Sequence, residues 1–205
     1  MGMNIGTGLR KQSIAIDPAI LARGFRDAFS NGKTVLTEDE ARAVLTQLQT
    51  DLRKKQMEET AKASDANKAQ GAAFLESNKE KEGIVTLPSG LQYKVLQEGT
   101  GPKPTATDQV VCNYRGTLLD GTEFDSSYKR GQPATFLVNH VIKGWTEALQ
   151  LMPVGSKWQL FVPANLAYGD RGTGPIGPNA TLIFEVELVS IQKPEAVQKP
   201  EAPKP

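Results

Sequence analysis

The sequence contains very few of the side chains from which metal centres, disulfides and nucleophilic sites are built. Among its 205 residues there is one cysteine, Cys112, and one histidine, His140. These two side chains cannot supply a zinc site or a disulfide framework, and a histidine-activated nucleophile would depend on His140 alone. The residue pattern favours an inert core thiol for Cys112 and a surface position for His140. We therefore expect no metal in this protein.

The sequence also lacks an excess of charge of one sign and long apolar runs. It has 24 lysines and arginines against 23 acidic residues, which gives a net charge of +1. Nucleic acids and anionic membranes are bound by clustered basic surfaces, so we expect no nucleic-acid partner. A membrane helix needs about 20 consecutive apolar residues, and no stretch comes near that length, so we expect no membrane span. The helical pattern starts with the first residues, so an export signal is expected to be absent or already removed.

The first 52 residues predict a helical module. Asp17 followed by Pro18 is typical of a helix start, and Thr37 with Glu40 forms the capping box of a longer helix. A module this small, without a disulfide or a metal, rarely buries enough apolar surface to fold alone. We therefore predict a homodimer through residues 1–52, with two-fold symmetry. The apolar residues expected to form its core are Ile5, Leu9, Ile14, Ile16, Leu21, Phe25, Phe29, Val44, Leu45, Leu48 and Leu52.

The next segment is polar on all sides. Between Arg53 and Gln70 the only large apolar residue is Met57, and alanine, lysine, glutamate and glutamine are frequent. These residues favour a helix, and a helix that is polar all round bridges solvent between modules. We predict an exposed linker helix over residues 53–82, continuing a helix that starts at Thr37.

From Gly83 on, apolar residues alternate with polar ones, which is typical of strands. Turn residues separate these runs, and one short helix is predicted from Gly144 to Leu151. The fold class is therefore α+β, with an antiparallel sheet wrapped on one short helix over residues 83–192. Residues 193–205 repeat Gln-Lys-Pro-Glu-Ala and predict a disordered, proline-rich tail.

Six ordered blocks stand out in this β-rich segment: Leu91-Gln92-Tyr93, Tyr114-Arg115-Gly116-Thr117-Leu118, the run from Asp120 to Ser127, Val141-Ile142-Lys143-Gly144-Trp145, the run from Pro163 to Gly169, and the run from Ile176 to Phe184. In order and spacing they resemble the FKBP-type peptidyl-prolyl cis/trans isomerases. Through Gly2-Met3-Asn4-Ile5-Gly6 and the run from Gly71 to Leu87, the N-terminal part is similar to the Mip-like (macrophage infectivity potentiator) branch, in which a helical module joins two subunits. The resemblance implies a half-open barrel around a short helix, with an apolar pocket between them.

Carried over residue by residue, the resemblance implies a pocket that needs no cofactor. Read alone, Trp145 would be an ordinary core aromatic and Asp125 a turn residue. Ala134 stands where many eukaryotic members have an aromatic wall, and the loop from Asp170 to Gly177 lacks a histidine that some members carry, so we expect a wider pocket mouth. The catalytic residues implied are Tyr114, Phe124, Asp125 and Tyr168, and the substrate-binding residues are Arg130, Phe136, Val141, Ile142, Trp145, Ile176 and Phe184.

The expected activity is isomerisation of Xaa-Pro bonds in unfolded or exposed polypeptides. The alternative is a dimeric holdase chaperone in which isomerase activity is incidental, and a third reading is a catalytically silent adaptor. The resemblance further implies inhibition by macrolides of the tacrolimus and rapamycin type. It places the protein in the periplasm or cell envelope, with the cytoplasm as the alternative.

Overall fold

The computed structural model describes residues 2–11 and 16–192, and it divides the chain into two compact units, Met1–Gln56 and Met57–Pro205. The first unit contains α1 (Gly2–Lys11), α2 (Pro18–Phe29) and the start of α3 (Glu38–Asn78). The predicted tail over residues 193–205 and the predicted core residue Ile14 lie outside the described residues.

The helix starts of the first unit follow the predicted capping chemistry. The Asp17 carboxylate accepts a hydrogen bond from the Ala19 amide at 2.7 Å, and Pro18 occupies the first helical position. At the start of α3 the Thr37 amide donates to Glu40 Oε2 at 2.9 Å, and the Glu40 amide donates back to Thr37 Oγ1 at 3.3 Å. The capping box is thus confirmed, and it fixes where the long helix begins.

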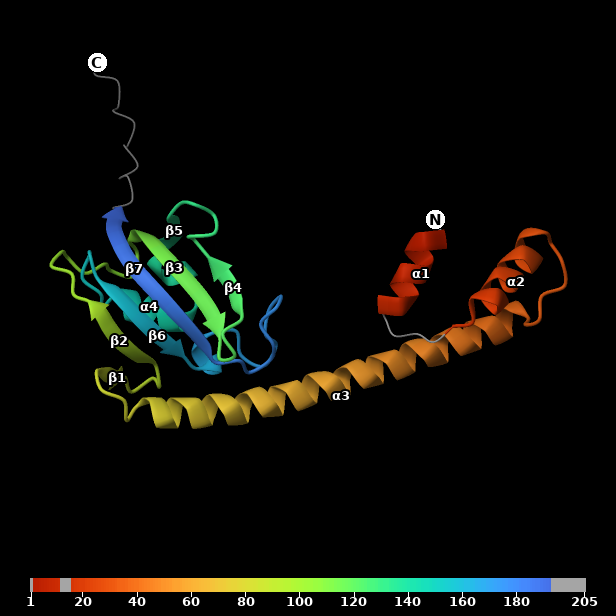
Figure 1. The fold of residues 1–205 in the computed structure, drawn as a ribbon, viewed down its shortest axis with the longest axis horizontal. Helices are drawn as coiled ribbons and strands as arrows, with labels where there is room; N and C mark the ends of the chain where they lie inside the picture. The colour runs from red at the N-terminus through yellow and green to blue at the C-terminus, as the bar shows by residue number, and fades with distance from the viewer. Residues whose placement is uncertain (1, 12–15, 193–205) are drawn as a thin grey trace, which may run out of the picture. The chain divides into compact units, whose positions relative to one another are not determined.

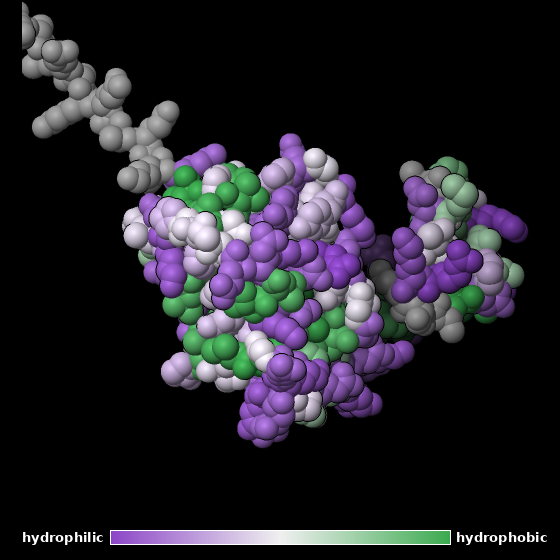
Figure 2. Space-filling model, turned by 60° about the vertical axis from the view of Figure 1, so that its left-hand side comes forward, coloured by the Kyte–Doolittle hydropathy of each residue, from purple (hydrophilic) through white to green (hydrophobic). Residues whose placement is uncertain are grey.

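None of the apolar side chains that the structure describes in this unit is fully buried within one chain. Val44 and Leu45 of α3 are 57% and 58% exposed, and Phe29 of α2 is 82% exposed. Figure 2 shows apolar side chains, in green, at the surface of the N-terminal helices. The apolar face of α3 is therefore only partly covered within one chain, because Leu48 and Leu52 are half-buried while Val44 and Leu45 are exposed. The burial of this face in a dimer stays a prediction.

The second unit is built on a seven-stranded antiparallel sheet with the order β1-β2-β6-β7-β3-β4, in which β5 also pairs with β3 (Figure 1). The last strand of the chain therefore lies in the middle of the sheet. Its alternating residues Leu182, Phe184, Val186 and Leu188 are buried, which confirms the predicted strand face. The strands are β1 (Ile84–Thr86), β2 (Gln92–Gln97), β3 (Gln109–Leu118), β4 (Glu123–Ser126), β5 (Ala134–Leu137), β6 (Lys157–Val162) and β7 (Leu182–Gln192).

One short helix, α4 (Lys143–Leu149), packs on the inner face of the curved sheet (Figure 1). A side chain at Gly144 would overlap Val162 of β6, so glycine allows the close approach of helix and sheet. The helix ends two residues earlier than predicted, because the chain turns at Gln150 toward Pro153. Two single turns, η1 (Val138–His140) and η2 (Ala164–Leu166), complete the unit.

The second part of α3, residues 57–78, departs from the predicted exposed linker. From Ser64 on, one face of this helix packs against the sheet domain, and Asn78 is only 1% exposed. The Asn78 amide donates to Gln92 Oε1 at 3.0 Å, and Gln92 Nε2 donates to the Leu75 carbonyl at 2.8 Å. The ring of Phe74 contacts that of Phe161 at a centroid distance of 5.8 Å. The contacts escaped the sequence analysis because they use mostly polar side chains at helical spacing, which resemble a solvated face.

No helix in the described part of the chain is both long enough and apolar enough to cross a membrane.

Candidate active site

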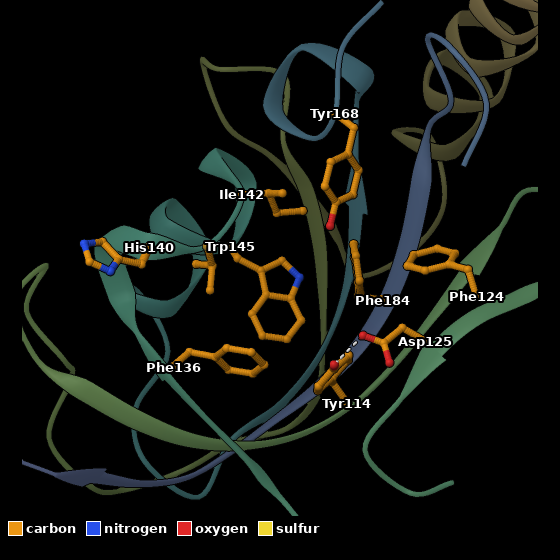
Figure 3. A pocket seen from close by; sticks show the side chains of 10 residues that line it. Tyr114, Phe124, Asp125, Phe136, His140, Ile142, Trp145, Tyr168 and Phe184 are labelled. Atoms are coloured by element: carbon orange, nitrogen blue, oxygen red, sulfur yellow. Dashed lines mark hydrogen bonds between the residues drawn. The ribbon is translucent and has the colours of Figure 1, made fainter. Parts of the chain in front are cut away.

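A cavity of about 380 Å³ opens between α4 and the inner face of the sheet (Figure 3). Its size is that of pockets that take small ligands or a few residues of a peptide. Its lining side chains come from strands β3, β4, β5 and β7 and from the segment between η1 and α4. One more, Tyr168, comes from the loop that follows η2. The lining residues are Tyr114, Phe124, Asp125, Phe136, His140, Val141, Ile142, Trp145, Tyr168 and Phe184.

The walls of the cavity are aromatic rings arranged edge to face around Trp145. The indole is 4% exposed, and its centroid lies 5.2 Å from Tyr114, 5.6 Å from Phe136 and 5.3 Å from Phe184. Such pairs favour one another beyond the area that they bury, so the floor of the pocket is rigid. The indole N–H is a buried donor without a hydrogen-bond partner in the described part of the chain.

Glycine at position 116 gives two of these rings their space. A Cβ at Gly116 of β3 would overlap both the Phe124 and the Phe184 ring. These two rings meet edge to face at 5.6 Å. The sequence block around Tyr114 therefore supplies both a lining residue and the gap into which its neighbours fit.

One side of the cavity carries a compact polar group. Tyr114 Oη donates to Asp125 Oδ2 at 2.5 Å, and Arg130 Nη2 donates to Tyr114 Oη at 2.6 Å. Arg130 also forms an ion pair with Asp125 Oδ1, which accepts a further hydrogen bond from the Ser126 amide. The carboxylate is thus held in one orientation at the pocket edge.

These contacts set the charge states of the group. Burial favours a raised pKa for the Asp125 carboxyl, but the hydrogen bonds from Tyr114 and Arg130 and the Arg130 charge outweigh it, so its pKa lies below 3.8. Burial, together with the hydrogen bond to Asp125, raises the pKa of Tyr114. At neutral pH, Asp125 is therefore an anion and Tyr114 a neutral phenol.

A second phenol lies on the other side of the cavity. Tyr168 is 41% exposed, and its hydroxyl points into the pocket (Figure 3). Burial, and then the charge of Asp125, raise the pKa of this phenol above 10.0. Tyr168 therefore keeps its proton at neutral pH and can donate a hydrogen bond to a ligand carbonyl.

Two family models match this chain. The model described as FKBP-type peptidyl-prolyl cis-trans isomerase matches residues 101–189, and the model of the domain amino terminal to it matches residues 1–95. A relative from Legionella longbeachae, named outer membrane protein MIP, is 54% identical over 194 residues, which cover 94% of this chain and 83% of the relative. The chain belongs to the FKBP-type peptidyl-prolyl cis/trans isomerases.

Further relatives agree with this assignment. The peptidyl-prolyl cis-trans isomerase Mip of Coxiella burnetii is 48% identical over 94% of this chain and 84% of its own length. The crystal structure of FkpA from Escherichia coli matches with a TM-score of 0.78 and 36% identity, covering 94% of this chain and 91% of FkpA. The protein is therefore an isomerase of Xaa-Pro peptide bonds, with the α+β architecture that the sequence predicted.

Most of the predicted site residues of this FKBP-type isomerase meet at the cavity, and two lie behind it. Arg130 contacts Asp125 and Tyr114 without lining the cavity, and Ile176 is buried in the hydrophobic core. Ala134 also packs on the core and does not line the cavity, so its effect on the pocket mouth remains a prediction.

His140 is the lining residue that the sequence analysis missed. It was interpreted as a surface residue without a role, and it is indeed exposed, but it stands at the mouth of the cavity. Its position directly before Val141 and Ile142 was the available signal. Cys112, in contrast, is fully buried, and burial followed by the nearby Glu187 raises the pKa of its thiol to about 12. This thiol is therefore unreactive at neutral pH.

Proposed function

We propose that this isomerase binds the proline of an unfolded or exposed polypeptide in the cavity above Trp145 and twists the preceding peptide bond there. The observation that carries this proposal is the combination of an aromatic floor with the hydrogen-bonding groups of Asp125 and Tyr168 at the edge. Trp145, Phe136 and Phe184 form the floor, and Asp125 and Tyr168 stand on opposite sides.

An apolar floor suits this reaction because of the electronic structure of the peptide bond. The barrier of about 18–20 kcal/mol arises because rotation destroys amide resonance. The planar amide carries a charge separation that weakens as the bond twists. A water-poor aromatic surface therefore disfavours the planar state relative to the twisted one. No nucleophile, proton transfer or cofactor enters this step.

The polar groups are assigned to holding the chain. Tyr168 donates its phenol proton to a substrate carbonyl next to the proline. Asp125 keeps the Tyr114 ring in place as a wall of the pocket, and Arg130 balances the carboxylate charge. Phe124, Val141, Ile142 and Ile176 shape or support the surface on which the proline ring rests.

The test is a pair of substitutions with a matched control. Tyr168→Phe removes only the hydroxyl, and Asp125→Ala removes the carboxylate, so each should lower kcat/KM in a protease-coupled proline-peptide assay by about tenfold. Tyr128→Phe is the control, because Tyr128 is exposed and does not line the cavity. Wild-type rates for both site variants would contradict the proposed roles.

The same pocket is proposed to bind macrolides of the tacrolimus and rapamycin type, whose pipecolyl ring mimics proline. Ala134 leads us to expect weaker binding than in eukaryotic members with an aromatic wall. Calorimetry checks this directly, and competition with the peptide substrate should follow binding. Absence of binding at high micromolar drug concentration would contradict the proposal.

We also propose that the protein forms a homodimer through residues 1–52. In each subunit the helix over residues 53–82 then joins this module to a catalytic domain over residues 83–192, and residues 193–205 form a tail. The supporting observation is the exposed apolar surface on α2 and α3, which includes the stacked Phe25 and Phe29 rings. Two catalytic units in one dimer would raise the local concentration of sites for a long client chain. Light scattering of the full chain tests this, and a monomer mass at tens of micromolar would refute it.

The same exposed apolar surface favours a holdase chaperone as the second candidate function. Suppression of aggregation by Tyr168→Phe at the wild-type level would separate chaperone activity from catalysis.

For the location we propose the periplasm or cell envelope, supported by the name of the Legionella relative. Fractionation of the native cells with an antibody against the protein tests this location.

A further inference from the structure

The loop that follows Tyr168 is closed on itself. The backbone N–H of Asn179 donates to the Gly169 carbonyl at 2.8 Å, so the two ends of the loop over residues 169–179 are joined. Within it, Thr173 and Ile176 exchange two backbone hydrogen bonds of 2.8 Å, and the Ile176 side chain is anchored in the core. The loop therefore moves as one piece, and Tyr168 is attached to one of its ends.

The second part of α3 contacts the other end of this loop. Asn67 Nδ2 donates to the Pro178 carbonyl at 2.8 Å, and Asn179 Nδ2 donates to Ser64 Oγ at 2.8 Å. Ser64 and Asn67 are three residues apart and so share one face of the helix. We call Ser64, Asn67, Pro178 and Asn179 the helix–loop clamp.

The backbone at Asn179 is adapted to this contact. Its φ of 54° lies in the left-handed region, which asparagine tolerates better than most residues with a side chain. Glycine would tolerate the same backbone but would lack the amide that reaches Ser64. The asparagine thus combines the turn that the loop needs with the hydrogen bond to α3.

Hydrogen bonds, more than close packing, hold the loop to the helix at this point. A cavity of about 100 Å³ lies between α3 and the start of β7, next to Asn67 and Gly177. Farther along the same helix face, Gly71 packs closely against the Thr181 side chain, and the Asn78 side chain donates a hydrogen bond to Gln92. These contacts fix α3 itself to the sheet domain. The helix is therefore the immobile side of the clamp.

We propose that Asn67 and Asn179 are positioning residues for Tyr168, so that the second part of α3 contributes to the catalytic machinery. The connection starts with the hydrogen bond from the Asn67 side chain to the Pro178 carbonyl. It continues through the next residue, Asn179, whose backbone N–H donates to the carbonyl of Gly169, the neighbour of Tyr168. Tyr168 is 41% exposed, so its own packing does not fix its position, and the backbone of the loop decides where the hydroxyl stands. The inference rests on the role proposed above for Tyr168.

The experiment is a double-mutant cycle between the clamp and the phenol. Asn67→Ala should lower kcat/KM by about threefold to tenfold in the wild-type background, since it removes one hydrogen bond. Alanine is the better helix former, so this loss cannot be ascribed to a weaker helix. In the Tyr168→Phe background, Asn67→Ala should have no further effect, because the hydroxyl that it positions is already gone.

Matched variants complete the test. Asn179→Gly keeps the left-handed backbone and removes only the side-chain bond, so it should lower kcat/KM by about the same factor as Asn67→Ala. Lys68→Ala, at an exposed position of the same helix, should leave kcat/KM unchanged. Ser64→Ala removes only the acceptor hydroxyl and replaces Asn67→Ala if the latter lowers stability too far.

The outcomes separate the two proposals. If Asn67→Ala and Asn179→Gly are at wild-type rate while Tyr168→Phe is slow, the clamp is refuted and the role of Tyr168 stands. If Asn67→Ala costs the same factor in both backgrounds, the route through Tyr168 is refuted. If Tyr168→Phe itself is at wild-type rate, the proposed role of the phenol is refuted, and the clamp with it.

Discussion

The two parts of α3 differ in which side chains they bury. In residues 38–56 large apolar side chains such as Val44 and Leu45 are exposed, whereas in residues 57–78 the polar Asn78 is buried. The difference follows from the partners that each face meets. Asn78 is buried because Gln92 accepts a hydrogen bond from its amide, while the described part of a single chain leaves Val44 and Leu45 more than half exposed. Polarity alone therefore does not determine burial along this helix; the available partners do.

The largest effect is expected from adding charge to the exposed part. Leu45→Asp should weaken the proposed dimer at least about a hundredfold, because central apolar residues contribute most of the binding energy of an interface. Sedimentation or light scattering over a concentration series measures the change. Gln49→Asp adds the same charge at an exposed polar position of α3 and is the control. An unchanged dimer with Leu45→Asp would show that α3 does not form the interface.

The next effect concerns the buried polar part. Asn78→Ala should lower the free energy of unfolding of the second unit by about 1–3 kcal/mol, because it leaves the buried Gln92 Oε1 without the donor that it has in the wild type. Both tryptophans, Trp145 and Trp158, belong to this unit, so urea unfolding followed by tryptophan fluorescence reports on it. Lys68→Ala should stay within about 0.5 kcal/mol of the wild type. Equal stability of both variants would contradict the docking of α3.

Two helical glycines give a test in which the sign of the effect decides. A Cβ at Gly71 would overlap the Thr181 hydroxyl, so Gly71→Ala should destabilise the protein by about 1–3 kcal/mol. Gly24 of α2 has free space around its Cα, so Gly24→Ala should stabilise by up to about 1 kcal/mol. Urea unfolding followed by circular dichroism measures both. The penalty of Gly71→Ala should be absent in a Thr181→Ala background, and stabilisation by Gly71→Ala would contradict the contact.

The smallest effect is expected from acid. Hydrogen bonds with the Thr37 backbone and hydroxyl lower the pKa of Glu40, and that of Asp125 is also lowered, as described above. A carboxyl with a lowered folded-state pKa stabilises the fold above its ordinary value near 4 and loses this contribution as the pH falls through the lowered pKa. Unfolding should thus be insensitive to both groups between pH 8 and 5.

The measurement compares Glu40→Gln and Asp125→Asn with the wild type in urea at pH 7 and pH 3. The difference from the wild type should shrink at pH 3 for both variants, followed by circular dichroism for the first and by fluorescence for the second. A difference that is constant from pH 7 to pH 3 would contradict the lowered pKa.

The parts of the fold that local chemistry dictates could be predicted from the sequence. Asp17, Thr37 and Glu40 cap their helices without help from the rest of the chain, and β7 alternates with the period of two that its burial requires. The family resemblance then brought together most of the cavity, including Trp145 and Tyr168.

The contacts that depend on matching polar partners could not be predicted. Ser64, Asn67 and Asn78 have the spacing of one helix face, but the same spacing occurs on any solvated helix. Their partners lie more than ten residues away in every case and more than a hundred in two. His140 was missed although it directly precedes the predicted pocket residues Val141 and Ile142, because no charged or metal-binding partner near it in the sequence suggested a role.

The central place of β7 in the sheet has a consequence for the synthesis of the protein. Until residues 182–192 leave the ribosome, β6 and β3 have no common neighbour and the sheet exists as two separate pieces. Phe184, which completes the aromatic wall, arrives with this last strand. The nascent chain therefore cannot close its pocket before β7 has emerged, and until then the catalyst of proline isomerisation is inactive on the prolines that precede this strand.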